Sequence, residues 1–395
     1  MGFMQQNQRQ WEQSSINVKT AAWIRVGALG DLLVGLASLV ETHKLFPHAE
    51  LYVVGPKLWC EILSPEEFPF VKKVVVIERR GQQARLFENR SSKWEPRDTR
   101  VWPLHDVLRQ CQAVVNTNID SYRYGFAAWR ARVPIRIGSA PGSMAWLYTN
   151  CAPFFGKDPM MHERDAALML LEYADSGWGK FFRSTERNRI NLVDWISSSV
   201  LIHRWRGIGL PPGKKKDFDR AHALTGCADG KYILLNPTAS RREKAWPSEN
   251  FYELAKCLQL RLKPLGIEVL ILGSPMETEW LLEVAKSEFK LVQPPTIFDL
   301  QDVLYSSYGL VTNTSSVQFI AAMTGTPTLT IMGRARPEIW GPLGKNDLVV
   351  LGHPPAELEE DIFIQELEGY KGIAVEEVER RALKLLRLEP ADANK

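Results

Sequence analysis

Short apolar runs, each followed by a loop and an amphipathic segment, recur along this chain in two separate series. The first series begins at Ala21–Val26, and the second restarts at Tyr232–Asn236, after a stretch rich in Gly, Pro and Lys. Strands that alternate with helices form parallel sheets covered by helices on both faces. The chain has 395 residues, whereas a single core seldom grows beyond about 250–300 residues. The pattern therefore predicts two doubly wound, Rossmann-like α/β domains.

The changes in composition set the predicted boundaries. We predict a disordered leader (1–20), an N-terminal domain (21–206) and a linker with exposed charge (207–230). A C-terminal domain (231–372) and a closing helix with a tail (373–395) follow. Residues 79–104 are polar and rich in Arg, which indicates a surface excursion. We place the first helix at about Asp31–His43 and another at His162–Tyr173. Further strands are expected at Glu50–Val54, Val71–Ile77, Ala113–Asn116, Ile267–Leu272, Leu310–Thr312 and Pro327–Met332.

Composition excludes several classes of protein. The formal net charge is only +3, which argues against a nucleic-acid binder. The five Cys are scattered and form no CxxC, which argues against a disulfide framework or a zinc site. The polar start has no signal-peptide core. The apolar stretch Leu29–Val40 contains Asp31 and is shorter than the roughly 18 residues of a membrane span. We expect a cytoplasmic protein with at most peripheral membrane contact.

The first strand-to-helix loop offers a candidate catalytic carboxylate. Gly27 and Gly30 permit a tight turn, and Asp31 follows at the start of a helix. Ligands of doubly wound sheets lie in such loops, at the carboxyl ends of the strands. Asp31 is also typical of a helix N-cap, and the two roles are compatible. The fingerprint GxGxxG is absent, which argues against a redox Rossmann enzyme.

Two loops of the second domain suit a phosphate. The loop Pro237–Pro247 carries hydroxyls, cations and an aromatic residue, and Ser248 after it is a plausible N-cap. A solvated charged loop is the alternative interpretation. The second loop consists of Asn313, Thr314 and Ser315 and leads into a helix that begins at Ser316. The N-terminus of a helix favours an anion. The alternative interpretation is that the hydroxyls only cap the helix. Together the loops predict a ligand that carries a diphosphate.

Several motifs occur in a fixed order. They are Gly27–Leu33, Asn236–Ser240 followed by Lys244, Trp246 and Pro247, then Leu272–Pro275, Thr312–Pro327 and Met332–Gly344. In this order and spacing they resemble glycosyltransferase family 9, the ADP-heptose heptosyltransferases of lipopolysaccharide synthesis. The resemblance covers roughly residues 22–345 and is strongest in the second half. It implies a GT-B fold, in which two Rossmann-like domains face each other across a cleft.

The resemblance also implies roles for single residues. Asp31 would be the general base of an inverting sugar transfer, with Gly30 and Asn118 on the acceptor side. Lys244 would hold the diphosphate of the donor. The other donor-binding residues would be Thr238, Ser240, Gly273, Asn313, Thr314, Ser315 and Ser316. The implied partners are an ADP-linked sugar and a glycan or lipid-linked glycan at the inner face of the inner membrane, with no nucleic acid, cofactor or metal.

The sequence departs from the family pattern at three places. The family's Asp-Thr-Gly is Thr314–Ser316, its His is Phe319, and its Asp-x-Gln is Asn116–Asn118. A GT-B enzyme with a different donor sugar, a GT-B sugar epimerase and a non-catalytic nucleotide-sugar-binding protein therefore stay open as alternatives. Asp217–Asp219 spells DxD, a metal-binding pattern of other glycosyltransferases. Since it lies in the predicted linker, we interpret it as solvated charge.

Overall fold

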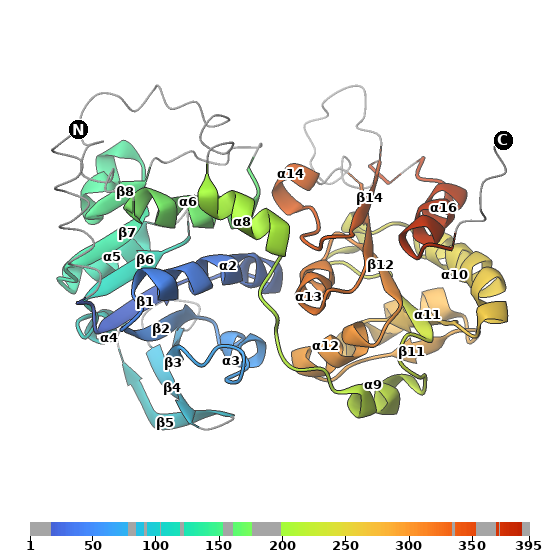
Figure 1. Ribbon diagram of the computed structural model, residues 1–395, viewed down its shortest axis with the longest axis horizontal. Coiled ribbons are helices and arrows are strands. Elements are labelled where there is room, and N and C mark those ends of the chain that lie inside the picture. The colour runs from blue at the N-terminus through green and yellow to red at the C-terminus, as the bar shows by residue number, and fades with distance from the viewer. Residues whose placement is uncertain are drawn as a thin grey trace. The chain divides into compact units, whose positions relative to one another are not determined.

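The computed structural model of the chain (Figure 1) describes residues 17–77, 84–90, 93–102, 104–118, 122–152, 161–175, 199–333, 336–352, 369–370 and 372–388. The chain divides into two compact units, Met1–Gly207 and Ile208–Lys395. Residues 1–16 of the expected leader and 389–395 of the tail lie outside the described residues, and Thr20 already begins the first strand. Each unit is described by itself.

Unit 1 is built on one eight-stranded sheet with the strand order β5-β4-β3-β2-β1-β6-β7-β8. The strands are β1 Thr20–Ile24, β2 Glu50–Gly55, β3 Val71–Ile77, β4 Ala84–Arg90, β5 Lys93–Trp102, β6 Ala113–Asn116, β7 Ile135–Ser139 and β8 Asn150–Ala152. The central strands are parallel, and β1 pairs with both β2 and β6. All residues of β1 from Ala21 to Ile24 are fully buried, as expected for a strand covered on both faces.

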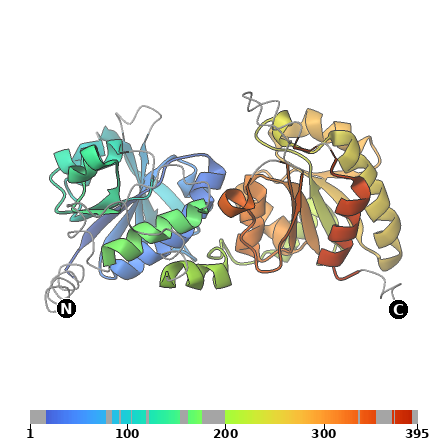
Figure 2. The same ribbon diagram turned by 90° about the horizontal axis from the view of Figure 1, so that it is seen from above.

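Helices cover both faces of this sheet (Figure 2). They are α2 Leu29–Leu45, α3 Trp59–Ile62, α4 Leu104–Leu108, α5 Arg123–Arg130, the 3-10 helix η1 Gly142–Leu147, α6 Glu163–Asp175 and α8 Val200–Ile208. On one face α2 packs against α6, and Glu41 of α2 accepts a hydrogen bond from Trp205 of α8 over 2.9 Å. On the other face α4 and α5 pack against Ile24, Val54 and Val75.

The expectation of a surface excursion over residues 79–104 is wrong for the described part of that stretch. β4 and β5 extend the sheet by antiparallel pairing, β4 on β3 and β5 on β4. The strands are hard to see in the sequence because they add to the edge of the sheet, where polar residues are tolerated and alternation is weak.

Unit 2 contains a six-stranded parallel sheet with the order β11-β10-β9-β12-β13-β14. The strands are β9 Tyr232–Asn236, β10 Glu268–Leu272, β11 Lys290–Val292, β12 Gly309–Asn313, β13 Thr328–Met332 and β14 Leu348–Leu351. One face is covered by α10 Ser248–Leu262, α11 Thr278–Ala285 and α16 Val375–Leu385, and the other by α9 Phe218–Thr225, α12 Ile297–Tyr305 and α13 Ser316–Thr324. Short elements complete the unit: η3 Arg242–Lys244, η4 Lys263–Leu265, η5 Pro275–Glu277 and α14 Pro337–Trp340.

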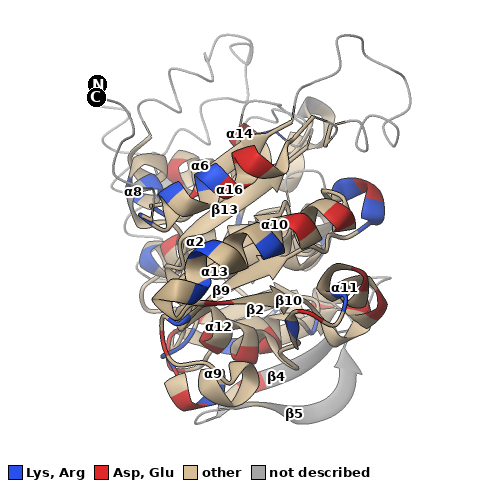
Figure 3. Ribbon diagram, turned by 90° about the vertical axis from the view of Figure 1, so that its right-hand side faces the viewer, with Lys and Arg blue, Asp and Glu red and all other residues tan. Residues whose placement is uncertain are grey.

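The core of unit 2 lies between its sheet and α10, α11 and α16. Ile233, Trp246 and Phe251 belong to this cluster and are almost fully buried. Charged residues of both signs mark the outer surfaces of α10 and α16 (Figure 3). On α16, Arg381 contacts Glu377 one turn earlier at 2.7 Å, a surface pair worth only about 0.3–0.5 kcal/mol.

The segment expected to be a linker contains a folded element. Asp217 caps α9 by accepting the N–H of Arg220 over 2.9 Å, so the DxD sequence opens a helix. Its neighbour Lys214, expected as exposed charge, pairs instead with the buried carboxylate of Asp302 at 2.6 Å. Arg220 of α9 pairs at 2.6 Å with Asp299, which lies on α12 as Asp302 does. These contacts fasten the start of unit 2 to α12.

Candidate active site

Each sheet has one topological switch point, where the order of strands reverses direction. In unit 1 it lies between β1 and β6, and in unit 2 between β9 and β12. Ligands of open α/β sheets bind outside the carboxyl ends of the strands at such points. Asn118, Ser240 and Thr314 lie in the loops after β6, β9 and β12, and Asp31 lies in the first turn of the helix that follows β1. The structure therefore places the predicted residues at the two switch points, each within its own unit.

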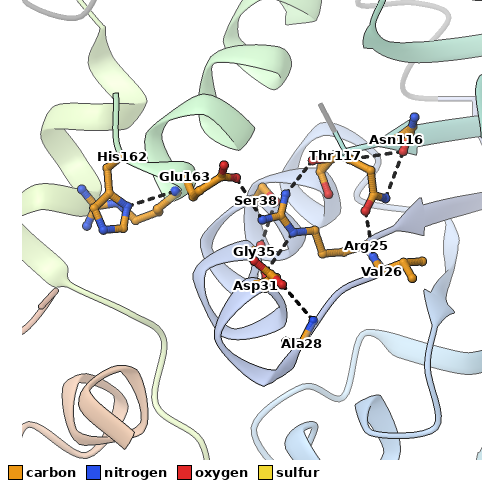
Figure 4. A network of polar contacts seen from close by, with 12 residues as sticks. Arg25, Val26, Ala28, Asp31, Gly35, Ser38, Asn116, Thr117, His162 and Glu163 are labelled. Atoms are coloured by element: carbon orange, nitrogen blue, oxygen red, sulfur yellow. Dashed lines mark hydrogen bonds and ion pairs between the residues drawn. The ribbon is translucent and has the colours of Figure 1, made fainter. Parts of the chain in front are cut away.

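Asp31 is the third residue of α2, and the helix begins two residues earlier than expected. Its Oδ2 accepts the N–H of Ala28 over 2.8 Å (Figure 4). The N-cap residue is Ala28, so the interpretation of Asp31 as an N-cap is wrong, although its side chain does serve the cap. A Cβ at Gly27 would lie 2.5 Å from the Cβ of Asp31, which explains the glycine. Gly30, half-buried in the first turn, presents no side chain beside the carboxylate.

Arg25 is the buried centre of the unit 1 loops, and sequence reasoning missed its role. It is only 4% exposed. Its Nε donates to the carbonyl of Asp31 over 2.9 Å, its Nη1 to the carbonyl of Thr117 over 2.7 Å, and its Nη2 contacts Glu163 at 3.3 Å (Figure 4). Its own carbonyl accepts from Trp59 over 3.0 Å. One guanidinium thus fixes the first turn of α2, the loop after β6 and the start of α6.

Asn118 fastens the β6 loop to the β1 loop. Its Oδ1 accepts the N–H of Val26 over 3.0 Å, and its Nδ2 donates to the carbonyl of Ile24 over 3.1 Å. Its neighbour Asn116 donates to the Tyr148 hydroxyl over 2.7 Å, and burial raises the pKa of Tyr148 to about 12. Both the oxygen and the nitrogen of the Asn118 amide are engaged, so the residue shapes the loop after β6.

In unit 2, Asn236 at the end of β9 joins the two candidate donor loops. Its Nδ2 donates to Thr238 Oγ1 over 3.1 Å and to the carbonyl of Leu272 over 3.0 Å. Its Oδ1 accepts from the hydroxyls of Thr312 over 2.9 Å and Ser315 over 3.3 Å. Thr238 is 3% exposed, so its hydroxyl forms part of the buried wall of the site.

Asn313 makes the second connection between these loops. Its Oδ1 accepts the N–H of Trp246 over 2.9 Å, and its Nδ2 donates to the carbonyl of Pro237 over 2.7 Å. Gly273 at the end of β10 has a packing reason, because a Cβ there would lie 2.7 Å from Leu281. Asn313 therefore holds the loops after β9 and β12 together, and Gly273 allows close packing at the end of β10.

The cations of the β9 loop have different surroundings. Arg242 forms a bidentate pair with Glu283, both distances being 2.7 Å, and this contact lowers the pKa of Glu283. Lys244 is half-buried at the end of η3, and its carbonyl accepts from the Tyr370 hydroxyl over 2.7 Å. Ser240 is exposed. The expectation that Ser248 caps α10 is wrong, since Pro247 holds that position.

The N-terminus of α13 carries hydroxyls and unsatisfied acceptors. Ser315 is its N-cap and accepts the N–H of Val317 over 3.3 Å, so the helix begins at Ser316 as expected. Among the described residues, the Oγ1 of Thr314 and the Oε1 of Gln318 are buried and have no hydrogen-bond partner. Buried polar atoms in native proteins are nearly always satisfied, so both atoms could still accept a hydrogen bond. Phe319, at the position of the family's His, is a core residue.

Within the described ranges, no group of three or more His, Cys, Asp or Glu could hold a metal ion. No helix in the described part of the chain is long and apolar enough to cross a membrane.

Two doubly wound α/β units, each with its polar loops at a switch point, define the class of GT-B proteins, and comparisons with known proteins support that fold. A glycosyl transferase family 9 structure from Veillonella parvula is similar with a TM-score of 0.67 and 18% identity, over 94% of this chain and 98% of that one. The ADP-heptose LPS heptosyltransferase II of E. coli is similar with a TM-score of 0.64 and 16% identity, over 94% and 100%. The structure of E. coli heptosyltransferase WaaC with ADP is similar with a TM-score of 0.56 and 14% identity, over 93% of this chain and 99% of that one.

The family model of glycosyltransferase family 9 (heptosyltransferase) matches residues 210–362. This match confirms the resemblance that the motifs indicate, and it places a domain of this family in unit 2. No curated protein matches the chain. At the level of class, these comparisons support a glycosyltransferase.

Proposed function

We propose that this glycosyltransferase moves a sugar from a nucleoside diphosphate donor to a hydroxyl of a glycan or lipid-linked glycan, with inversion at the anomeric carbon. The observation that carries the proposal is the placement of Asp31. Its carboxylate stands at the switch point of unit 1, half-buried, with Oδ2 held by Ala28 and its backbone held by Arg25. A carboxylate held in this way suits a general base, whose geometry must be fixed.

In the proposed reaction, Asp31 accepts the proton of the acceptor hydroxyl as that oxygen forms its bond to the anomeric carbon. The bond from this carbon to the diphosphate breaks on the opposite side, and the nucleoside diphosphate leaves with the electron pair. Lys244 and the N–H groups at the start of α13 would stabilise the negative charge that develops on the leaving group. The scheme uses no metal, and transfer that persists in excess chelator would support this part of the proposal.

For the donor, the names of the similar structures favour an ADP-linked heptose. A different donor sugar is the second candidate, and a specific feature favours it. Thr314 stands where the family has Asp, and its buried hydroxyl oxygen has no partner in the part of the chain that the structure describes. A neutral hydroxyl both donates and accepts, whereas a carboxylate only accepts, so the two residues would select different sugar hydroxyls.

The test begins with a thermal-shift panel of nucleoside diphosphates and nucleotide sugars, because a ligand of the native state raises the melting temperature. Transfer from the best donor is then measured with Asp31→Asn. Asn can still accept the N–H of Ala28, so the fold should be kept, while turnover should fall about 10²–10⁴-fold. Asp31→Ala is the control that also removes the cap. Wild-type turnover by Asp31→Asn would refute the assignment of the base.

A further inference from the structure

Four large aromatic side chains form an exposed cluster on unit 1, here called the aromatic face. It consists of Tyr122, Phe126 and Trp129 on and beside α5, and Trp146 on η1, which are 46%, 46%, 43% and 48% exposed. Three of the four rings contact one another in a row. Phe126 and Trp129 have centroids 5.6 Å apart, and Trp129 and Trp146 lie edge to face at 5.0 Å. The position of α5 is marked in Figure 1.

Helix α5 has its large and small residues reversed with respect to an ordinary surface helix. Gly125 and Ala128 face the protein, while Phe126 and Trp129 face solvent. A Cβ at Gly125 would lie 2.5 Å from the Tyr148 hydroxyl, so the helix rests closely on that ring. A surface helix normally buries its apolar stripe, and a contiguous exposed apolar patch marks an interaction site.

The segment that carries the aromatic face has charge of one sign. Residues 122–152 contain four Arg and no Asp or Glu. Arg136 is bonded to the carbonyls of Leu147 and Val133, whereas Arg123, Arg130 and Arg132 are exposed and have no ion-pair partner among the described residues. On the adjoining helix α4, Asp106 contacts His105 at 2.7 Å. The face is therefore aromatic in its middle and cationic around it.

One of these arginines occupies a position that favours glycine. Arg132 has a φ of 58°, and it ends α5 in a Schellman motif, in which Arg132 N–H donates to Trp129 and Val133 N–H to Ala128. This left-handed position is usually taken by Gly, because a side chain is strained there. The chain thus places a cation beside Trp129 despite its backbone cost.

We propose that the aromatic face binds the interfacial region of a lipid bilayer that contains anionic headgroups. Trp and Tyr are enriched at the level of the headgroups, where an apolar ring and a polar group are both accommodated. Arg side chains pair with lipid phosphates, and an anionic surface attracts each one with about 1 kcal/mol, or about fivefold in affinity. The absence of acidic residues from 122–152 fits such a surface. This binding does not depend on the sugar transfer.

The aromatic face is connected to the acceptor-side loop, and this consequence rests on the proposed function. Arg123 begins α5 five residues after Asn118. Tyr148, on which Gly125 rests, accepts a hydrogen bond from Asn116. A lipid-linked acceptor held in the bilayer would therefore reach the protein beside the loop that Asn118 shapes.

The experiment is co-sedimentation of the full chain with vesicles of phosphatidylcholine alone or mixed equally with phosphatidylglycerol. We expect binding to the mixed vesicles that weakens as salt rises. The double variant Phe126→Ala, Trp129→Ala should bind at least about tenfold more weakly, because it removes two of the four exposed rings. Arg130→Ala and Arg132→Gly should each lose about fivefold.

Two variants in unit 2 serve as matched controls. Leu260→Ala removes an apolar side chain that is 78% exposed on α10. Arg387→Gly removes an exposed Arg that has a φ of 56° and ends α16 in the same kind of Schellman motif as Arg132. Both should bind the mixed vesicles like the wild type. Thermal melts of all variants confirm that the fold is kept.

Three outcomes would overturn the proposal. They are failure of the wild type to bind the mixed vesicles, equal binding by the aromatic double variant, and equal loss in the unit 2 controls. If light scattering shows self-association that the double variant abolishes, the face is an interface between copies instead. Asp31→Asn should bind vesicles like the wild type. A failure of the proposed sugar transfer can therefore be distinguished from a failure of the proposed membrane binding.

Discussion

Arg25 donates a hydrogen bond from its Nε to the main-chain carbonyl of Asp31 over 2.9 Å, so the residue directly after β1 fixes the turn that carries the candidate base. Because the same guanidinium also reaches Thr117 and Glu163, Arg25 acts as a positioning residue for Asp31. The sheet of unit 1 and the candidate base are coupled through this one buried side chain.

Replacing Arg25 by Lys should separate positioning from charge. A lysine ammonium is a point charge that cannot match the spread of acceptors served by the planar guanidinium. We expect a loss of about 2 kcal/mol in the free energy of unfolding. The turnover number should fall, while the affinity for nucleoside diphosphate stays unchanged because the donor loops belong to unit 2. Arg109→Lys, at an exposed position of unit 1, is the control in denaturant titrations and kinetics. Equal behaviour of both variants would contradict the assignment.

Lys244→Ala should weaken binding of a nucleoside diphosphate by about tenfold or more, since a charge-assisted hydrogen bond is worth about 1.5–3 kcal/mol. Isothermal calorimetry measures this directly. Lys256→Ala is the matched control, because Lys256 lies on the exposed side of α10 and pairs with Glu253 at 3.3 Å. An unchanged dissociation constant for Lys244→Ala would remove Lys244 from the donor site.

Arg132→Gly and Arg387→Gly should each stabilise the protein. Both residues hold a left-handed conformation, with φ of 58° and 56°. Relief of this strain is offset in part by the greater freedom of glycine in the unfolded chain, so we expect a net gain of about 0.5 kcal/mol per site. Thermal or urea unfolding of the two variants provides the measurement. A loss of stability at either site would show that the arginine makes a compensating contact.

Asp347 should give unit 2 a measurable pH dependence. Burial raises the pKa of Asp347 to about 6, against hydrogen bonds from the N–H groups of Gly344 and Thr328 that lower it. With the pKa raised in the folded state, the unfolded chain loses its proton first as pH rises. The contribution of this group to stability is therefore full below about pH 4 and declines up to about pH 6, by roughly 2–3 kcal/mol.

Asp347→Asn is the corresponding variant, because the amide does not titrate. Its unfolding free energy should lack this decline between about pH 4 and pH 6. Comparison of urea unfolding curves for the two proteins across this range isolates the contribution of the group. Parallel pH profiles for the wild type and Asp347→Asn would show that Asp347 titrates alike in both states.

The sequence predicts the central parallel strands because they are buried on both faces and read as continuous apolar runs, but it misses the short parallel strands β8, β11 and β14 at the edges of the sheets. It misses β4 and β5, whose pairing is non-local and whose residues are polar. It identifies Asp31 and the hydroxyl loops, since these follow strands directly. It cannot show that Arg25 serves several backbone carbonyls, or that Gly125 makes room for Tyr148, because such contacts join segments distant in sequence. It also places the caps at Asp31 and Ser248, whereas the chain starts those helices after Ala28 and Pro247.

The Asn236 cluster has a consequence for how ligands would be bound. The Asn236 amide forms hydrogen bonds with Thr238, Leu272, Thr312 and Ser315. The loops after β9 and β12 are therefore ordered as the chain folds. A ligand that arrives at these loops would then lose less conformational entropy in ordering them, and a larger share of its contact energy would appear as affinity. Folding thus orders these loops once, before any donor binds, and binding of a donor does not have to order them again.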